Sequence, residues 1–89
     1  MNYELVFSKR SRKNISKFDR KNQVVILKKI RMLRDNPSIG KPLKSSARKL
    51  RSLRVGKYRV IYKINEKISI LAVGHRKDIY HFTFTKNKL

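Results

Sequence analysis

The stretch that decides the fold is LRSLRVGKYRVIY, residues 50–62. Apolar and polar residues alternate on both sides of Gly56-Lys57, with the two-residue period of a half-buried strand. A glycine at the first position of a two-residue connection suits the tight turn of a β-hairpin. This turn sets the residues that face each other: Val55 with Tyr58, Leu53 with Val60, and Arg54 with Arg59. We therefore predict an antiparallel hairpin that places two arginines side by side, opposite the apolar face.

A second turn, at residues 65–67, extends the hairpin into a three-stranded meander. With those three residues as the loop, the predicted partners are Ile64 with Ile68, Tyr62 with Ile70, Val60 with Ala72, Ile61 with Leu71, Arg59 with Val73, and Lys57 with His75. In this register Arg54, Arg59 and His75 share the face of the sheet that is turned away from the helices, which we call the open face. Arg76 follows directly at the strand end.

The cations on the open face allow two interpretations. Like charges directly opposite each other destabilise a sheet, so their placement fits a site for an anion such as phosphate. With 25 Lys and Arg in 89 residues, chance neighbours that only keep the face soluble are the alternative. Ile61, Leu71 and Val73 share this face in the predicted register, so we expect the C-terminal segment or a partner helix to cover part of it. Tyr58 and Tyr62 have the opposite parity and are expected in the core.

Upstream of the hairpin, apolar residues recur at three- and four-residue spacing, which indicates helices. Ser and Asp are favoured helix caps, and Pro ends a helix. The predicted elements are a strand at residues 3–7, a helix from Ser8 to about Phe18, a helix from Asp19 to Asn36-Pro37, a loop at residues 38–47, and the meander. Residues 1–89 are thus expected to form a single α+β domain, with a strand, a two-helix hairpin and an antiparallel meander.

Composition narrows the partners. The formal net charge is +20, yet 39% of the residues are hydrophobic, so the chain is expected to fold and to seek a polyanion or an acidic protein. No stretch approaches the roughly 20 apolar residues that span a bilayer, and residues 1–4 lack a signal-peptide pattern. Cysteine is absent and the two histidines lack a third ligand. We expect a cytoplasmic protein without membrane contact, metal or cofactor.

Two stretches resemble a known family. Residues 50–62 are similar to the signature of RelE/ParE-type toxins, and VGHRKDIY, residues 73–80, is similar to their C-terminal motif. The element order also matches the family fold, an antiparallel sheet with two helices on one face. The resemblance implies a toxin of a type II toxin–antitoxin system, either a RelE-like ribosome-dependent mRNA endonuclease or a ParE-like DNA gyrase inhibitor without nuclease activity. It also implies an acidic, RelB-like antitoxin, with operator DNA bound only through the toxin–antitoxin complex.

The resemblance further implies roles for individual residues. RNA carries its own nucleophile, the 2′-hydroxyl, so a cleaving protein must move protons and stabilise charge on the phosphate. Arg59 and Arg76 match family arginines and are expected to clamp phosphate, since a guanidinium grips its oxygens at two points. Tyr80 matches a tyrosine used in proton transfer, and His75 is a candidate acid or base near neutral pH. The other expected RNA contacts are Arg54, Arg51, Lys49 and Lys57.

One departure from the family pattern concerns two lysines that RelE-like ribonucleases place on the strand before the glycine turn. Those positions fall on Leu50 and Ser52 here. A shift of register that brings in a neighbouring cation is one way to replace them. Their loss otherwise favours the gyrase inhibitor. A basic binding module without activity is a third interpretation of the chain.

Overall fold

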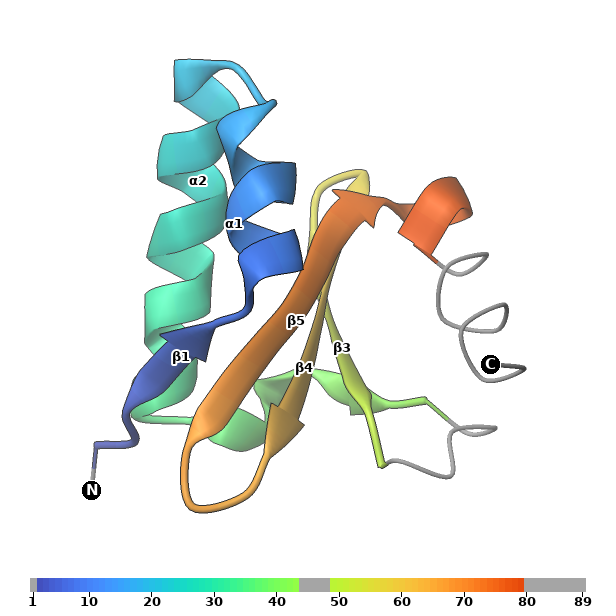
Figure 1. Ribbon diagram of the computed structural model, residues 1–89. Coiled ribbons are helices and arrows are strands. Elements are labelled where there is room, and N and C mark those ends of the chain that lie inside the picture. Colours follow the sequence, from blue (N-terminus) through green and yellow to red (C-terminus); the bar gives the residue numbers. More distant parts are fainter. Residues whose placement is uncertain (1, 44–48, 80–89) are drawn as a thin grey trace.

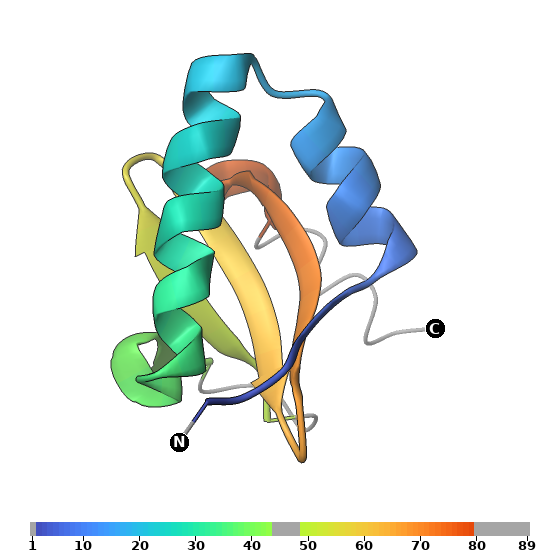
Figure 2. The same cartoon turned by 90° about the vertical axis from the view of Figure 1, so that its left-hand side faces the viewer.

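The computed structural model describes residues 2–43 and 49–79 (Figure 1). Its elements in chain order are β1 (Leu5–Phe7), α1 (Lys9–Ser16), α2 (Arg20–Arg31), the 3-10 turns η1 (Met32–Arg34) and η2 (Pro37–Ile39), β2 (Lys41–Pro42), β3 (Arg51–Val55), β4 (Tyr58–Ile64) and β5 (Ile68–His75). Both helices lie on one face of the sheet, as Figure 2 shows. The predicted α+β class and the placement of the helices are confirmed.

The two helices begin at the predicted caps. The Ser8 hydroxyl accepts a hydrogen bond from the Ser11 N–H at 3.0 Å, and an Asp19 carboxylate oxygen accepts one from the Asn22 N–H at 2.9 Å. Each bond satisfies a backbone donor that has no partner inside its helix. The first helix ends at Ser16, two residues before the predicted Phe18. Among the described residues, no helix has the length and apolar character to cross a membrane.

The sheet has the order β1-β5-β4-β3-β2, with β1 parallel to β5 and the other pairs antiparallel. The strand β2 lies in the stretch predicted as a loop, so that prediction is wrong for Lys41 and Pro42. Two residues are too short for a periodic signal, and a proline usually argues against a strand. It is tolerated here because β2 is an edge strand.

The first hairpin has the predicted register. Arg54 faces Arg59, Leu53 faces Val60, and Val55 faces Tyr58. At the turn, Gly56 has a φ of 59°, a left-handed conformation in which a side chain is disfavoured.

The second hairpin departs from the predicted register halfway along. The pairs Ile64–Ile68 and Tyr62–Ile70 are confirmed, but a β-bulge follows, and the later pairs are Ile61 with Ala72, Val60 with Val73, Arg59 with Gly74, and Tyr58 with His75. An extra residue, Leu71, therefore reverses the parity of the rest of β5. The predictions that Val73 and His75 lie on the open face are wrong, because both lie on the same side as the residues of β4 that face the helices.

The bulge has a physical cause in α1. The Ser8 hydroxyl donates to the Leu71 carbonyl at 2.9 Å, and the Asn14 side-chain oxygen accepts from the Val73 N–H at 3.0 Å. These bonds satisfy backbone groups that the end of β1 leaves without a strand partner. A contact between residues about 60 positions apart leaves no trace in the local alternation.

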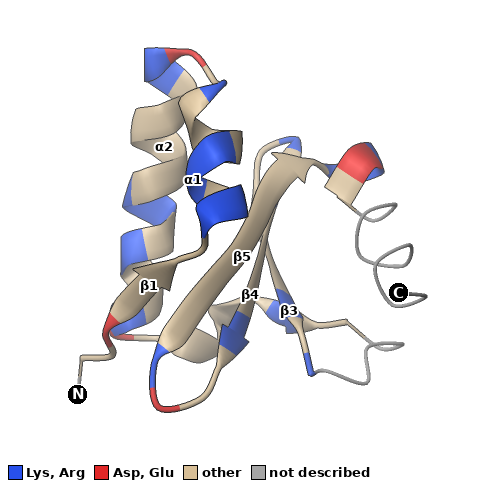
Figure 3. Ribbon diagram, viewed as in Figure 1, with Lys and Arg blue, Asp and Glu red and all other residues tan. Residues whose placement is uncertain are grey.

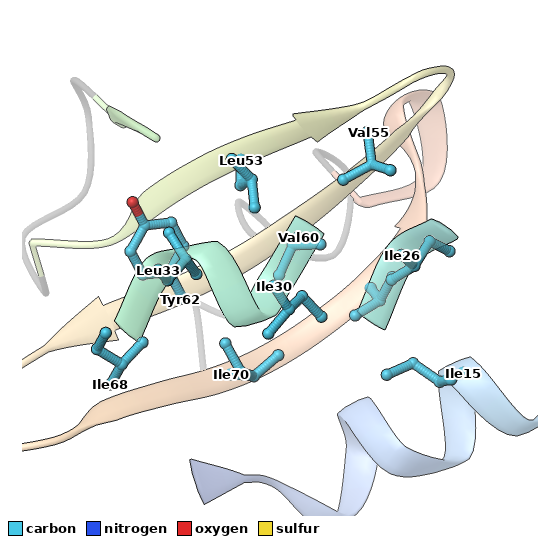
Figure 4. Close-up of a cluster of buried hydrophobic side chains, with 11 residues drawn as sticks. Ile15, Ile26, Ile30, Leu33, Leu53, Val55, Val60, Tyr62, Ile68 and Ile70 are labelled. Carbon is cyan, nitrogen blue, oxygen red and sulfur yellow. The ribbon is translucent and has the colours of Figure 1, made fainter. Parts of the chain in front are cut away.

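The main core lies between the helices and the sheet. Figure 4 shows Ile15, Ile26 and Ile30 from the helices directed at the strand residues Leu53, Val60 and Ile70. Tyr62 is fully buried in this core and Tyr58 packs against it at half exposure, so both are placed as predicted.

A second, smaller core lies on the open face. Leu50, Ile61, Ala72 and Ile79 are buried together, with Leu43 and Leu71 packed against them. Ile79 belongs to a helical turn at residues 76–79 that folds over this face. The prediction that a segment covers Ile61 and Leu71 is thus confirmed.

Candidate nucleic-acid interface

A pocket of about 330 Å³ lies at the β2 edge of the sheet. It is lined by Ile39, Lys41, Pro42, Leu43, Ser52, Arg54 and Arg59, and we call it the arginine pocket. None of these lining residues is acidic, so the described wall of the pocket carries three positive charges and no negative one. A pocket of this composition favours an anion.

Two of the three charges come from Arg54 and Arg59, as predicted. The residues face each other across β3 and β4, with Arg54 exposed and Arg59 half-buried. Opposed like charges on a sheet cost some tenths of a kcal/mol or more. A phosphate bound between the two arginines would offset their repulsion, and the planar guanidinium can hold phosphate oxygens at two points.

Ser52 contributes a buried hydroxyl to the same pocket. Only 6% of the residue is exposed, and its hydroxyl oxygen has no hydrogen-bond partner among the described residues. Buried hydroxyls are nearly always hydrogen-bonded, because the loss of water is otherwise uncompensated. The Ser52 hydroxyl can therefore donate a hydrogen bond to an anion that binds in the pocket with the two arginines.

Lys41 supplies the third charge from the neighbouring strand. It pairs with Ser52 across β2 and β3, so the two side chains lie on the same side of the sheet, and Lys41 is exposed. Sequence reasoning missed Lys41, and it named Ser52 only as a position where the family lysine is absent. The signal that could have found Ser52 is its two-residue spacing from Arg54, which gives both residues the same parity.

Arg51 is not part of the arginine pocket. It has the parity of Leu53, and its guanidinium donates to the backbone carbonyls of Gly40 at 2.6 Å and Ser38 at 3.2 Å. These bonds hold the segment before β2 against the sheet. The structure therefore separates Arg51 from Arg54 and Arg59, with which it was grouped.

The same segment is held by Tyr62 from inside the core. Its hydroxyl donates to the Pro37 carbonyl at 2.7 Å and accepts from the Gly40 N–H at 3.0 Å. A Cβ at position 40 would lie 2.5 Å from that hydroxyl oxygen, so only glycine fits there. Tyr62 and Arg51 thereby fix the strand that carries Lys41.

His75 and Lys57 lie at a different place, a groove of about 420 Å³ between α1 and the end of β5. The His75 ring meets Tyr58 edge-on, with 6.4 Å between the ring centroids. The ammonium of Lys57 lies 5.9 Å from the centroid of the Tyr58 ring. Neither residue lines the arginine pocket.

Arg76 and Lys49 are exposed and also lie outside that pocket. The Arg76 N–H donates to the Lys57 carbonyl at 3.1 Å, which starts the turn at residues 76–79. Lys49 precedes β3 with a φ of 57°. Tyr80, the predicted proton-transfer residue, lies outside the described residues. Within residues 2–43 and 49–79, no three His, Cys, Asp or Glu side chains gather as metal ligands would.

Positive charge extends well beyond the pocket. Figure 3 shows Lys and Arg along both helices and on β3 and β4, with few acidic residues among them. The arginine pocket is therefore one local feature of a surface that attracts polyanions as a whole.

Comparison with known proteins identifies the class to which this fold and site belong. A family model described as ParE toxin of type II toxin-antitoxin system, parDE, matches residues 5–80. A search of curated protein sequences found no match.

Three solved structures are similar to the chain. A chain of the toxin–antitoxin complex RelBE2 from Mycobacterium tuberculosis has a TM-score of 0.77 and 27% identity, covering 85% of this chain and 93% of that one. The archaeal RelE–RelB complex from Pyrococcus horikoshii OT3 gives a TM-score of 0.71, 25% identity, and coverage of 85% and 97%. A chromosomal ParDE system from P. aeruginosa gives 0.64, 11% identity, and coverage of 82% and 95%, which shows the fold alone.

The fold is that of the RelE/ParE toxins, and the resemblance seen in the sequence is confirmed. The chain belongs to the ParE toxin family, and it is a toxin of a type II toxin–antitoxin system.

Proposed function

We propose that the chain is a ribosome-dependent mRNA endonuclease that stops translation until an acidic, RelB-like antitoxin binds it. The observation that carries the proposal is the arginine pocket. Arg54 and Arg59 line it from two neighbouring strands, together with the buried hydroxyl of Ser52. The two similar RelE complexes, at 25% identity or more, support the RelE-like alternative.

The reaction needs little covalent chemistry from the protein. In the proposed step, the 2′-hydroxyl of the RNA loses its proton to a water molecule and attacks the adjacent phosphorus. A 2′,3′-cyclic phosphate forms, the bond from phosphorus to the 5′-oxygen of the next nucleotide breaks, and that oxygen takes up a proton. Arg59 stabilises the charge that builds on the phosphate oxygens, and Arg54 holds the phosphodiester in place. Arg76 follows β5 at the same end of the meander as the first hairpin turn, and we propose that it clamps a neighbouring phosphate.

Proton transfer is assigned to the C-terminal motif. The family resemblance implies that Tyr80 takes part in proton transfer, and we propose that it protonates the leaving 5′-oxygen. His75 is the less suitable candidate, because the bulge turns it to the helix side of β5, away from the arginines. Exposed Lys49 and Lys57 are proposed to contact phosphates of ribosomal RNA or mRNA, and that contribution depends steeply on salt.

The partner is proposed from charge and from the comparisons. The charge of +20 favours a partner protein that is rich in Asp and Glu. The similar M. tuberculosis and P. horikoshii structures are toxin–antitoxin complexes. We propose that operator DNA is bound only through such a complex, and that the toxin acts in the cytoplasm, where ribosomes are found.

The second candidate is a ParE-like DNA gyrase inhibitor without nuclease activity. Leu50 favours it, because it occupies one of the expected lysine positions and is 1% exposed within the second core. The matching family model is also that of ParE toxins.

Two assays on the same purified protein separate the candidates. An endonuclease cuts mRNA in a translation reaction and leaves gyrase supercoiling unaffected, whereas a gyrase inhibitor blocks supercoiling and leaves mRNA intact. Arg59→Ala should abolish cutting while the protein still folds and binds its antitoxin. Lys21→Ala, which removes one exposed charge from α2, is the matched control and should cut as wild type does. Cutting that survives Arg59→Ala refutes the assigned site.

A further inference from the structure

Lys41 and Ser52 have no role in the reaction proposed above, yet both line the arginine pocket. Lys41 lies on β2, directly opposite Ser52 on β3, and the pocket that they line also includes Arg54 and Arg59. We propose that these two residues complete a phosphate subsite, in which one phosphodiester is held by the Lys41 ammonium, the Ser52 hydroxyl and the guanidinium groups of Arg54 and Arg59. The inference deepens the proposed function by naming further residues of its substrate site.

The first argument comes from the Ser52 hydroxyl. It is buried, its residue is 94% covered, and no described residue accepts or donates a hydrogen bond to it. Serine at such a position lowers stability relative to alanine unless something else provides a partner. A phosphate oxygen in the pocket is a strong acceptor, and a bond from a neutral hydroxyl to a charged oxygen is among the stronger hydrogen bonds in proteins.

The second argument comes from the placement of Lys41. A lysine on an edge strand is usually only a solvated charge. This one is fixed in register with Ser52, and the preceding residue, Gly40, is held by the Tyr62 hydroxyl and by the Arg51 guanidinium. Two separate hydrogen bonds therefore fix the residue that precedes β2. Lys41 follows Gly40 directly and lines the same pocket as Arg54 and Arg59, so a single anion in that pocket can be reached by all three cations.

The third argument is the size and charge of the pocket. Its volume of about 330 Å³ is at the small end of ligand pockets and accommodates a phosphate with part of a nucleotide. Ile39, Pro42 and Leu43 supply the apolar part of its lining, and the remaining lining residues are polar or positively charged.

Binding of an RNA that cannot be cut tests the subsite separately from catalysis. The probe is a fluorescein-labelled ten-nucleotide RNA with 2′-O-methyl groups throughout, and its Kd is measured by fluorescence anisotropy at fixed salt. Lys41→Ala should weaken binding about tenfold, the effect of one charged hydrogen bond, and Lys21→Ala no more than about threefold. If the two variants weaken binding equally, Lys41 acts only through overall charge, and the inference is wrong.

Ser52→Ala gives a readout that a structural serine would not give. Binding should weaken about threefold to tenfold, while the melting temperature stays the same or rises, because an unpartnered buried hydroxyl has been removed. A lower melting temperature would mean that the hydroxyl is bonded within the folded chain, and this result overturns the assignment.

The double variant Lys41→Ala/Ser52→Lys transfers the ammonium from β2 to the facing position on β3. It should restore the Kd to within about threefold of wild type if the pocket requires a cation at this point. A failure to restore binding while the variant melts like wild type contradicts the subsite. If Lys41→Ala and Ser52→Ala instead weaken binding of the antitoxin and leave the RNA Kd unchanged, the pocket holds a carboxylate of the partner, and the phosphate assignment is wrong.

The outcome for the subsite is separate from that for the nuclease. Weakened binding by Lys41→Ala in a protein that never cuts mRNA leaves the subsite standing and removes the nuclease. If wild-type toxin cuts mRNA and neither variant changes the Kd for RNA, the nuclease stands and the subsite is wrong.

Discussion

Replacing Tyr62 with phenylalanine removes the hydroxyl that holds the segment before β2 against the sheet. That hydroxyl donates to the Pro37 carbonyl and accepts from the Gly40 N–H. Gly40 is buried, so its N–H would lose its partner without access to water, whereas Pro37 is half-buried and its carbonyl can be partly rehydrated. The variant therefore tests whether a single buried oxygen fixes the edge of the candidate site.

The expected loss follows from these two groups. A buried polar group left without a partner costs about 1–3 kcal/mol, and a partly hydrated one costs about 1 kcal/mol or less. We expect the free energy of unfolding to fall by about 2–3 kcal/mol. For a domain of this size, that corresponds to a melting temperature lower by about 10–20 °C. Urea denaturation should show a lower midpoint with an unchanged slope, since the exposed surface on unfolding stays the same.

Tyr58→Phe is the matched control, because it deletes the same atom from the same strand. Among the described residues, the Tyr58 hydroxyl accepts a single long hydrogen bond, 3.4 Å from the Asn22 side-chain nitrogen, and the residue is half-buried. Its loss should cost less than about 0.5 kcal/mol. If Tyr62→Phe and Tyr58→Phe unfold within about 0.5 kcal/mol of each other, the contact with Gly40 and Pro37 does not hold the edge, and the reasoning is refuted.

Three further predictions concern the helices, the second core and the charge. Asp19→Ala should lower the free energy of unfolding by about 1 kcal/mol, because it removes the cap of α2, while Asp19→Asn should nearly restore it in urea titrations; equal losses would contradict the capping role. Leu50→Lys should cost about 3 kcal/mol or more without raising cutting, because the ammonium enters an apolar cluster; a stable, more active variant would show that this position opens to the substrate. Binding of single-stranded RNA should weaken linearly with the logarithm of salt concentration, and Arg54→Ala should reduce that slope by about 0.7, the value for one phosphate contact; an unchanged slope would place Arg54 outside the contact.

Much of the fold could be predicted because its signals are local. The alternation around Gly56, the caps at Ser8 and Asp19, and the turn at residues 65–67 each depend on a few neighbouring residues, and all agree with the structure. The apolar parity of Tyr62 placed it correctly in the core.

The second half of β5 could not be predicted in the same way. Its register depends on Ser8 and Asn14, which bind the backbone of residues 71 and 73 from a helix far away in the sequence. With the bulge, His75 changes face, and the candidate site loses its expected histidine. A contact of this kind becomes visible only when the helix is packed on the sheet.

The candidate site could be predicted only where a local signal was present. The opposed pair Arg54 and Arg59 follows directly from the hairpin turn, and the structure brings both into one pocket. Arg51 could have been excluded from the sequence, because it has the parity of Leu53 and not of Arg54. Lys41 could not have been included, because a two-residue strand with a proline gives no periodic signal.

The central claim is that the arginine pocket cuts mRNA on the ribosome, and a reconstituted translation reaction tests it most directly. Purified wild-type toxin is added to ribosomes translating a defined mRNA, and primer extension maps the 5′ ends. We predict new ends within codons that form only when ribosomes are present, that disappear with Arg59→Ala, and that persist with Lys21→Ala. Intact mRNA with wild-type toxin, under conditions in which the toxin blocks gyrase, would contradict the claim.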